Sequence, residues 1–333
     1  MKTTIIRHII IGAVEQEADL IAVLKGQGTR AEKSGACRKL SQFGTKEAVA
    51  PLAELLDNDE LSHMARYGLE TIPDPAVDAA LREALGKIKG GHLAGVIGSV
   101  GVRRDATAIP QLAGFLKDPD SEVVQAAARA LGKIGTSEAA EALKKALPAT
   151  TDQNQLNVIE GLLRCADSLE LNGDKAKARE IFDQIQGQLH AAHQVRTASL
   201  RGAVLTRGNE GIPKILTAIK GEDFSQVAAA IRTSQELEGP EIVKALSDEL
   251  KSLPPQKQVL VVQTLALRKD AGILPVLISA AEQGEVPVRL AAIRALPQIG
   301  DESAVPMLKK LAENENSRIK KAAVKALNFF TKS

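Results

Sequence analysis

Apolar residues recur along this chain with the spacing of paired amphipathic helices. Between Val123 and Ile134 they step by four, four and three positions, which places them on one stripe of an α-helix. Gly135 then ends the pattern, and a second apolar stripe runs from Ala140 to Leu147. A glycine after a helical stripe is typical of a helix end. The pattern therefore predicts a helix, a tight turn and a second helix.

The same helical pair recurs at a period of about 31 residues. Residues 123–135 reappear 165 positions downstream as residues 288–300, with the same apolar spacing and the same final Ile-Gly pair. Self-similarity of this kind is typical of a solenoid, in which each unit buries its apolar face against its neighbours. We therefore predict an all-α fold, a right-handed α-solenoid (superhelix) of about ten helical hairpins.

Two regions depart from this period. Within residues 151–220 the spacing lengthens, and a helix over 152–171 is predicted to be longer than its equivalents. In the third unit, the turn Val102–Asp105 is predicted to be about three residues longer than its counterparts. Because no Ser/Gly-rich linker interrupts the chain, we predict a single solenoid domain over residues 1–333. Its expected parts are an N-terminal cap or degenerate leader (1–28), regular repeats (29–150), longer irregular repeats (151–220), and repeats with a C-terminal cap (221–333).

Composition narrows the expected class of partner. The chain has 333 residues, of which 25% are charged, and its formal net charge is +2. A dedicated nucleic-acid-binding protein would carry a strong excess of basic residues. Only 2% of the residues are aromatic, which leaves few side chains on which bases could stack. We therefore expect no nucleic-acid partner.

The N-terminal residues bear on the location of the protein. The apolar run Ile9–Val14 is six residues long and follows Arg7 and His8, whereas the apolar core of a secretory signal needs about 7–15 residues. No stretch approaches the roughly 18 apolar residues of a membrane span. We therefore expect a cytoplasmic location without membrane insertion. If residues 1–14 are the remnant of a signal peptide, the alternative is a periplasmic or secreted protein.

Residues 122–135 also carry a resemblance to a known family. This segment resembles a HEAT repeat, in particular the short bacterial kind named after phycobilisome lyases, and the resemblance covers about residues 30–333. Residues 63–70, followed by Ile72–Pro75, are similar to a block in HEAT-repeat proteins of planctomycete-type bacteria. The resemblance implies a superhelical scaffold for protein–protein contacts, with the first helix of each pair on the convex side and the second lining the concave side.

The residue pattern gives no sign of a catalytic or metal centre. HEAT-type di-iron hydroxylases use repeated His-Glu pairs, and none of the five histidines here precedes a glutamate. Cys37 and Cys165 are 128 positions apart, too far for a short metal or redox motif, and we interpret them as buried apolar residues. We expect no catalytic residue, no metal and no cofactor, and hence a non-catalytic scaffold that binds a partner protein.

An enzymatic alternative depends on the resemblance alone. It is a lyase or chaperone-like enzyme subunit of the phycobilin-lyase type, acting on a tetrapyrrole-bearing protein. A tetrapyrrole site would need aromatic and arginine side chains around a mostly apolar pocket, and the chain has few aromatic residues. Both hypotheses stay open at the level of the sequence.

Five residues are candidates for the partner-binding surface. His63, Arg66 and Tyr67 have the spacing i, i+3 and i+4, which places them on one helix face, and Tyr67 is the only tyrosine. Arg103 and Arg104 lie in the turn that is predicted to be longer. Tyrosine and arginine are enriched at binding hot spots, and solenoids bind partners on the concave face or along an edge of turns.

A competing hypothesis assigns the same residues to the architecture. Tyr67 would then pack between neighbouring first helices, and the two arginines would pair with Asp105 or with other acids nearby. The sequence does not indicate an oligomeric state.

Overall fold

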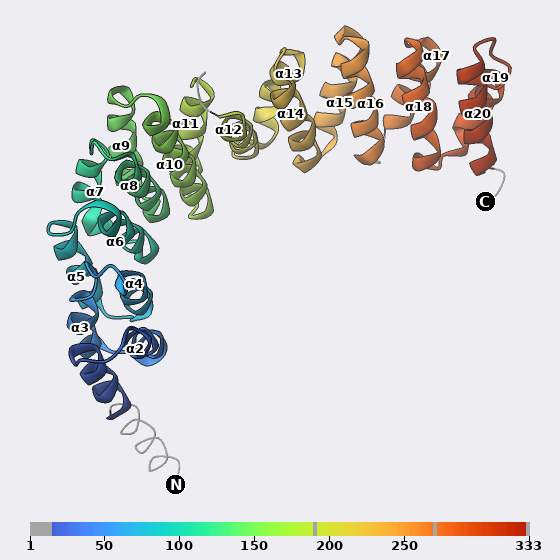
Figure 1. Cartoon of the computed structure of the whole chain (residues 1–333). Coiled ribbons are helices and arrows are strands. Elements are labelled where there is room, and N and C mark those ends of the chain that lie inside the picture. Colours follow the sequence, from blue (N-terminus) through green and yellow to red (C-terminus); the bar gives the residue numbers. More distant parts are fainter. Residues whose placement is uncertain (1–14, 189–191, 269–271, 331–333) are drawn as a thin grey trace. The chain divides into compact units, whose positions relative to one another are not determined.

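The chain folds into stacked α-helical hairpins, as a computed structural model shows (Figure 1). The structure describes residues 15–188, 192–268 and 272–330, and among these residues there is no β-strand. The predicted all-α fold of stacked hairpins, the architecture of an α-solenoid, is confirmed.

Two compact units make up the chain, Met1–Val195 and Arg196–Ser333. Their boundary falls inside the segment 151–220, where the sequence predicts irregular repeats. That residues 1–333 form a single domain stays a prediction.

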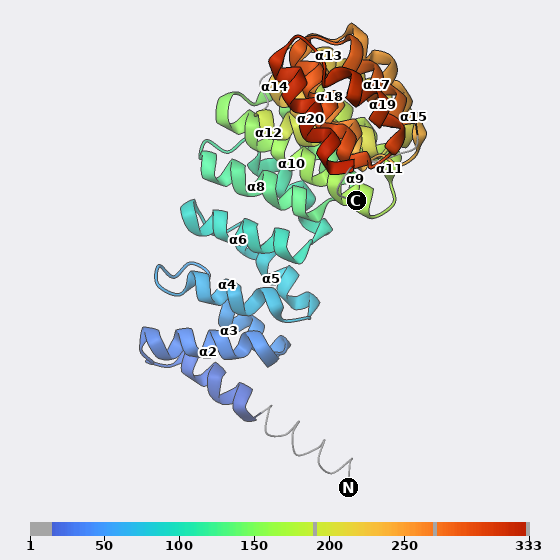
Figure 2. The same ribbon diagram turned by 90° about the vertical axis from the view of Figure 1, so that its right-hand side faces the viewer.

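Five helical hairpins form most of the described part of the N-terminal unit, each with a first and a second helix. The first helices are α2 (Arg30–Phe43), α4 (Ser62–Thr71), α6 (Gly90–Arg103), α8 (Ser121–Ile134) and α10 (Asp152–Leu171). The second helices are α3 (Val49–Ala53), α5 (Pro75–Leu85), α7 (Ile109–Phe115), α9 (Ser137–Ala146) and α11 (Lys175–Gln186). Each first helix packs on the next first helix along the chain (Figure 2). With 20 residues, α10 has the bounds that the sequence predicts.

A further helical segment, residues 15–25, precedes the first hairpin. Its Glu17 is buried, and the Glu17 carboxylate accepts hydrogen bonds from the backbone N–H of Thr45 at 2.7 Å and from the Thr45 hydroxyl at 3.0 Å. These bonds tie the segment to the turn between α2 and α3. Residues 1–14, for which a cap or a degenerate leader is expected, lie outside the described residues.

The two layers of the N-terminal unit differ in position. Figure 1 shows its first helices on the inner side of the curve along which the hairpins of this unit stack, with the second helices outside. The resemblance implies the opposite order. Within this unit, the first helices therefore form the inner surface.

The C-terminal unit repeats the arrangement with four hairpins and a last single helix among the described residues. The first helices are α12 (His193–Leu205), α14 (Phe224–Glu236), α16 (Pro255–Arg268), α18 (Val286–Ile299) and α20 (Ser317–Phe330). The second helices are α13 (Ile212–Lys220), α15 (Pro240–Glu249), α17 (Ile273–Gln283) and α19 (Val305–Leu311). From α14 onward, each first helix again packs on the next.

Local sequence explains where these helices begin and end, as α8 illustrates. Asp120 precedes the helix, and its carboxylate accepts a hydrogen bond from the backbone N–H of Glu122 at 2.9 Å, which caps the N-terminal end. Ala127 and Leu131 lie on its buried stripe and are fully buried. Gly135 then adopts a φ of 67°, a left-handed conformation that glycine reaches without strain, and ends the helix.

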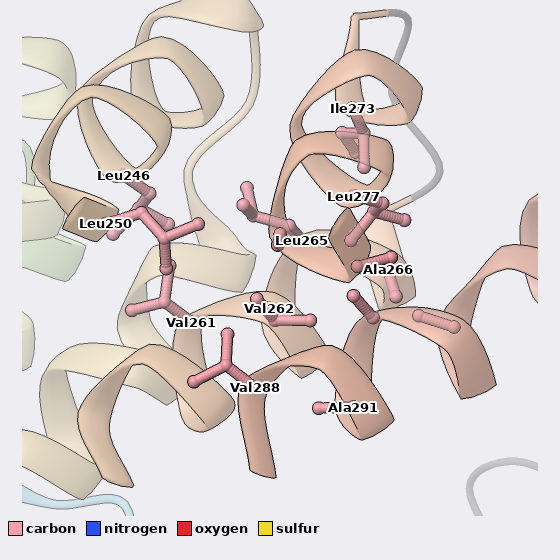
Figure 3. Close-up of a cluster of buried hydrophobic side chains, with 14 of the residues drawn as sticks. Leu246, Leu250, Val261, Val262, Leu265, Ala266, Ile273, Leu277, Val288 and Ala291 are labelled. Carbon is pink, nitrogen blue, oxygen red and sulfur yellow. The ribbon is translucent and has the colours of Figure 1, made fainter. Parts of the chain in front are cut away.

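The apolar core runs from hairpin to hairpin within the C-terminal unit. Figure 3 shows the part where α15, α16, α17 and α18 meet. The buried side chains labelled there are Leu246, Leu250, Val261, Val262, Leu265, Ala266, Ile273, Leu277, Val288 and Ala291. Each hairpin packs apolar side chains against the hairpin before it and the hairpin after it. These side chains are therefore buried only when both neighbouring hairpins are present.

The third hairpin corrects one prediction. Helix α6 continues to Arg103, and Arg104 ends it in the left-handed region, with φ 57° and ψ 39°. Gly135 after α8 and Gly300 after α18 have the equivalent position and conformation. The turn after α6 is therefore no longer than its counterparts, and the prediction of a longer turn was wrong. Arg103 occupies the position in α6 that Ile134 occupies in α8. The apolar stripe of α6 therefore ends earlier than that of α8, although the two helices end at the same position.

Gly101 of α6 provides a test of the close contact between first helices. A Cβ at this position would lie 2.6 Å from the Cα of Ala130 on α8. We predict that Gly101→Ala lowers the free energy of unfolding by about 1–3 kcal/mol, because the two helices must separate. Gly98→Ala on the same helix is the matched control, since a Cβ there meets nothing within 4 Å, and should raise stability by about 0.5–1 kcal/mol. Urea denaturation of the whole chain measures both effects, and equal effects would contradict the prediction.

Candidate functional site

The structure places His63, Arg66 and Tyr67 on one face of α4, as their spacing predicts. Tyr67 is 47% exposed, so it does not fill a space between first helices. His63 is also exposed, and its Nδ1 lies 3.5 Å from an Nη atom of Arg66. The α4 face therefore presents an exposed aromatic ring and an exposed imidazole, together with the half-buried guanidinium of Arg66.

Arg66 has a second contact, which links α4 to α6. Its Nη1 donates a hydrogen bond to the backbone oxygen of Gly95 at 3.4 Å. A Cβ at Gly95 would lie 2.8 Å from the Cζ atom of Arg66, so the guanidinium would have to move from this position. Burial lowers the pKa of Arg66, and the negative charge of Glu70 opposes this shift. The guanidinium stays positively charged at neutral pH because its reference pKa is so high.

Arg103 lies at the other end of α4 and has a structural role. Only 12% of its side chain is exposed. Its guanidinium donates hydrogen bonds to the backbone oxygens of Ile72 at 2.8 Å, Asp74 at 3.2 Å and Glu70 at 3.3 Å, and it forms an ion pair with Asp78. The last carbonyl groups of a helix have no partner inside the helix. Arg103 therefore caps the C-terminal end of α4 from the next hairpin.

The same device occurs in the C-terminal unit, where sequence reasoning missed it. Arg268 ends α16 and donates hydrogen bonds to the backbone oxygens of Leu237 at 2.7 Å and Ser234 at 2.8 Å. A longer bond of 3.3 Å reaches the oxygen of Gly239. These oxygens belong to the last turn of α14 and to the residues directly after it, as those bound by Arg103 belong to the last turn of α4 and the residues after it. An arginine in the place of the last apolar residue of a first helix is the sequence signal for this inter-repeat cap.

Arg104 and Asp105 do not form the pair that the competing hypothesis includes. Arg104 is exposed in the left-handed position after α6. Asp105 instead forms an ion pair with Arg82, and its second oxygen accepts a hydrogen bond from the backbone N–H of Thr107 at 3.0 Å. Since Arg103 and Arg104 lie beyond the C-terminal end of α4 and His63 lies near its N-terminal end, the five candidates do not converge on one cluster. Their role in partner binding stays a prediction.

Both cysteines are fully buried. Burial raises the pKa of Cys37 to about 11 and that of Cys165 to about 12. The Sγ of Cys165 also lies 3.5 Å from the backbone oxygen of Leu131. A thiol reacts as a nucleophile through its thiolate, so these two groups are poor candidates for covalent chemistry.

The large apolar side chains that stay exposed share one property. All of them in the described part of the chain lie on first helices, and none lies on a second helix. They are Tyr67, Val102, Leu171, Phe224, Leu267, Val324 and Phe329. In each unit, the exposed large apolar side chains among the described residues therefore belong to the first-helix layer.

Two adjoining grooves lie on the first-helix layer of the C-terminal unit. The first, which we call the α18/α20 groove, has a volume of about 700 Å³. Its lining includes Leu290, Arg294, Arg318, Lys321, Lys325 and Phe329. The second groove, of about 610 Å³ between α16 and α18, shares Leu290, Arg294 and Arg318 with the first. Sequence reasoning predicted only a C-terminal cap within residues 221–333 and missed these grooves, because their shape depends on how two helices pack.

Residues 15–188, 192–268 and 272–330 contain neither a metal-binding cluster nor a helix that could cross a membrane. No group of three or more His, Cys, Asp and Glu side chains there could hold a metal ion. In the same residues, no helix combines the length and the apolar character that crossing a membrane requires.

Comparison with known proteins identifies the repeat. The family model for HEAT repeats matches residues 67–162 and 243–328, which is more than half of the chain. No curated protein matches the sequence. The subtype named after phycobilisome lyases, the similarity to planctomycete-type proteins and the lyase alternative stay hypotheses.

Solved structures share the fold at low sequence identity. The karyopherin Kap121p, bound to the extreme C-terminus of the protein phosphatase Cdc14p, has a TM-score of 0.54 at 11% identity. The match covers 96% of this chain and 42% of Kap121p, so this chain spans less than half of that protein. Human deoxyhypusine hydroxylase in complex with glycerol has a TM-score of 0.34 at 21% identity, over 89% of this chain and 100% of that one.

Arg103 and Arg104 should respond differently to substitution. We predict that Arg103→Ala lowers the free energy of unfolding by about 2 kcal/mol or more, because it removes bonds to the end of α4 and leaves Asp78 unpaired. Arg104→Gly should raise stability by about 1 kcal/mol, because glycine adopts the positive φ without strain. Chemical denaturation measures both. A loss of stability with Arg104→Gly would show that its side chain supports the fold.

The cysteine pKa values predict slow alkylation of the folded chain. At pH 8, iodoacetamide should modify both thiols at least roughly 100-fold more slowly than in the unfolded chain, because burial suppresses the thiolate and blocks access. Mass spectrometry over time, with the chain in concentrated guanidinium chloride as the control, measures this difference. Rapid modification of Cys165 in the folded chain would contradict it.

Proposed function

The chain belongs to the HEAT-repeat family, and on that premise we propose that it is a non-catalytic scaffold that binds a partner protein through its first-helix layer. One observation carries the proposal: the large apolar side chains that stay exposed lie on first helices. Their recurrence on the same layer of successive hairpins supports a contact along that layer, because solenoids bind partners on extended surfaces that run across several repeats.

The α4 face is the proposed contact in the N-terminal unit. Tyr67 supplies an exposed ring at 47%, and the guanidinium of Arg66 and the imidazole of His63 lie beside it. A rigid aromatic residue next to an arginine has the composition of an interface hot spot. The hydrogen bond from Arg66 to α6 favours one position of its guanidinium, which lowers the entropy that a partner must remove on binding.

The turn after α6 contributes Arg104 alone to the proposed surface. We assign Arg103 to the architecture, since its hydrogen-bonding groups already contact the end of α4. The fold of Kap121p supports a binding role by analogy, because the solved structure of that protein contains a bound protein C-terminus.

Site-specific photo-crosslinking tests the proposal. With benzoyl-phenylalanine in place of Tyr67 on the first-helix layer, irradiation in native lysate should yield a discrete protein adduct. Placement at Lys145, exposed on the second helix α9, is the matched control and should yield none. Tyr67→Ala should weaken recovery of the same protein by about ten-fold without changing the melting temperature, because the ring is exposed. Equal adducts from both positions would contradict a role for the first-helix layer.

A further inference from the structure

We propose that the α18/α20 groove docks an acidic amphipathic helix of a partner protein. This inference depends on the proposed function and adds the chemistry of the partner to it. Three properties of the groove support it, namely an apolar floor, uncompensated basic residues and a continuous face about one helix long.

The floor of the groove is apolar and narrow. Leu290 on α18 and Ala326 on α20 are each 4% exposed, and Ala322 is half-buried one turn before Ala326. Two alanines on the same face of α20 leave space that longer side chains would fill. Phe329, 50% exposed, follows on that face. A partner side chain such as leucine can therefore enter between the two helices and be buried there.

Basic residues line the same groove, and no acidic residue is part of its lining. They are Arg294, Arg318, Lys321 and Lys325. None of the four forms an ion pair within the described part of the chain. The three helices α16, α18 and α20 contain no Asp or Glu. Elsewhere in the same unit, Lys220 on α13 lies 2.7 Å from Glu249 and is paired. Charge complementarity therefore favours a ligand that carries carboxylates.

The groove also has the length of a helix. On α20 the lining positions 318, 321, 322, 325, 326 and 329 follow the i, i+3, i+4 pattern and form one continuous face. Helices α18 and α20 have 14 residues each, which corresponds to about 21 Å. A partner helix of about four turns can lie along this length, with apolar anchors in the floor and carboxylates against the basic residues.

A nucleic acid fits the same groove less well. Phosphate groups bind to cations on a solvated surface and gain nothing from a buried apolar floor. Single-stranded bases stack on a series of aromatic rings. Among the described residues that line the groove, only Phe329 is aromatic. The apolar floor therefore favours a protein ligand.

Synthetic peptides test the inference with the whole chain. The probe is a fluorescein-labelled peptide of about 15 residues, the length of the groove, with leucines on one helix face and glutamates on its flanks. One control peptide carries lysine for every glutamate, and another has the same composition with the leucines distributed around the helix. Fluorescence anisotropy should detect binding of the first peptide at least about ten-fold tighter than either control. Added salt should weaken this binding, because it depends on charge.

Paired variants locate the binding. Lys321→Ala with Lys325→Ala should weaken binding of the acidic peptide by about ten-fold. Lys309→Ala with Lys320→Ala is the matched control, since it removes the same charge from exposed positions of this unit outside the groove lining and should change binding by about two-fold or less. Phe329→Ala should also weaken binding about ten-fold while the circular dichroism spectrum stays unchanged, because the ring is half exposed.

Several results would overturn the inference. Absence of binding by the acidic peptide, equal binding of the lysine peptide, or equal loss in both double variants would each do so. Tighter binding of a single-stranded oligonucleotide would assign the groove to nucleic acid, and self-association that Lys321→Ala with Lys325→Ala abolishes would assign it to a second copy. If a partner cross-links at position 67 but the acidic peptide does not bind the groove, this inference is rejected and the proposed function is not. Peptide binding without any adduct in lysate would reject the proposed α4 contact instead.

Discussion

The close approach of consecutive first helices is the contact on which the rest of the structure depends. Glycine and alanine lie where these helices meet: a Cβ at Gly101 would meet the backbone of Ala130, and a Cβ at Gly161 would lie 2.7 Å from the oxygen of Ala128. Only at this separation can the apolar stripes of neighbouring hairpins bury one another. The core, the inter-repeat arginine caps and the grooves on the first-helix layer all follow from this spacing.

Most of the fold could be predicted because its signals are local and repeated. The apolar stripe from Val123 to Ile134 and the glycine after it recur so regularly that helix, turn and helix follow from the spacing alone. The prediction failed at Arg103, where a charged residue replaces the last apolar residue of the stripe. A periodic pattern reports which side of a helix is buried, but it does not report that a guanidinium at the end of one helix caps another helix.

The candidate site was predictable only in part, for the same reason. The spacing of His63, Arg66 and Tyr67 correctly placed three side chains on one face of α4. It did not show that Arg66 reaches Gly95 on the next first helix, or that Arg103 contacts the far end of α4. The α18/α20 groove was missed altogether, because it is a property of two helices and of the small alanines between them. A net charge of +2 over the whole chain also concealed three helices without a single acidic residue.

The inter-repeat arginine caps reveal a second, longer period in the chain. Arg103 and Arg268 are 165 positions apart, the same separation as that between residues 123–135 and residues 288–300. A shift of 165 positions in the sequence relates α6 to α16 and α8 to α18, which lie five hairpins further along the chain. The segment from α6 to α8 and the segment from α16 to α18 therefore stay in register under a shift of 165 positions, and the arginine cap has the same place in both. The cap is thus a property of a position in the array, and an arginine at the equivalent position of any other first helix should bind the carbonyl groups at the end of the first helix before it.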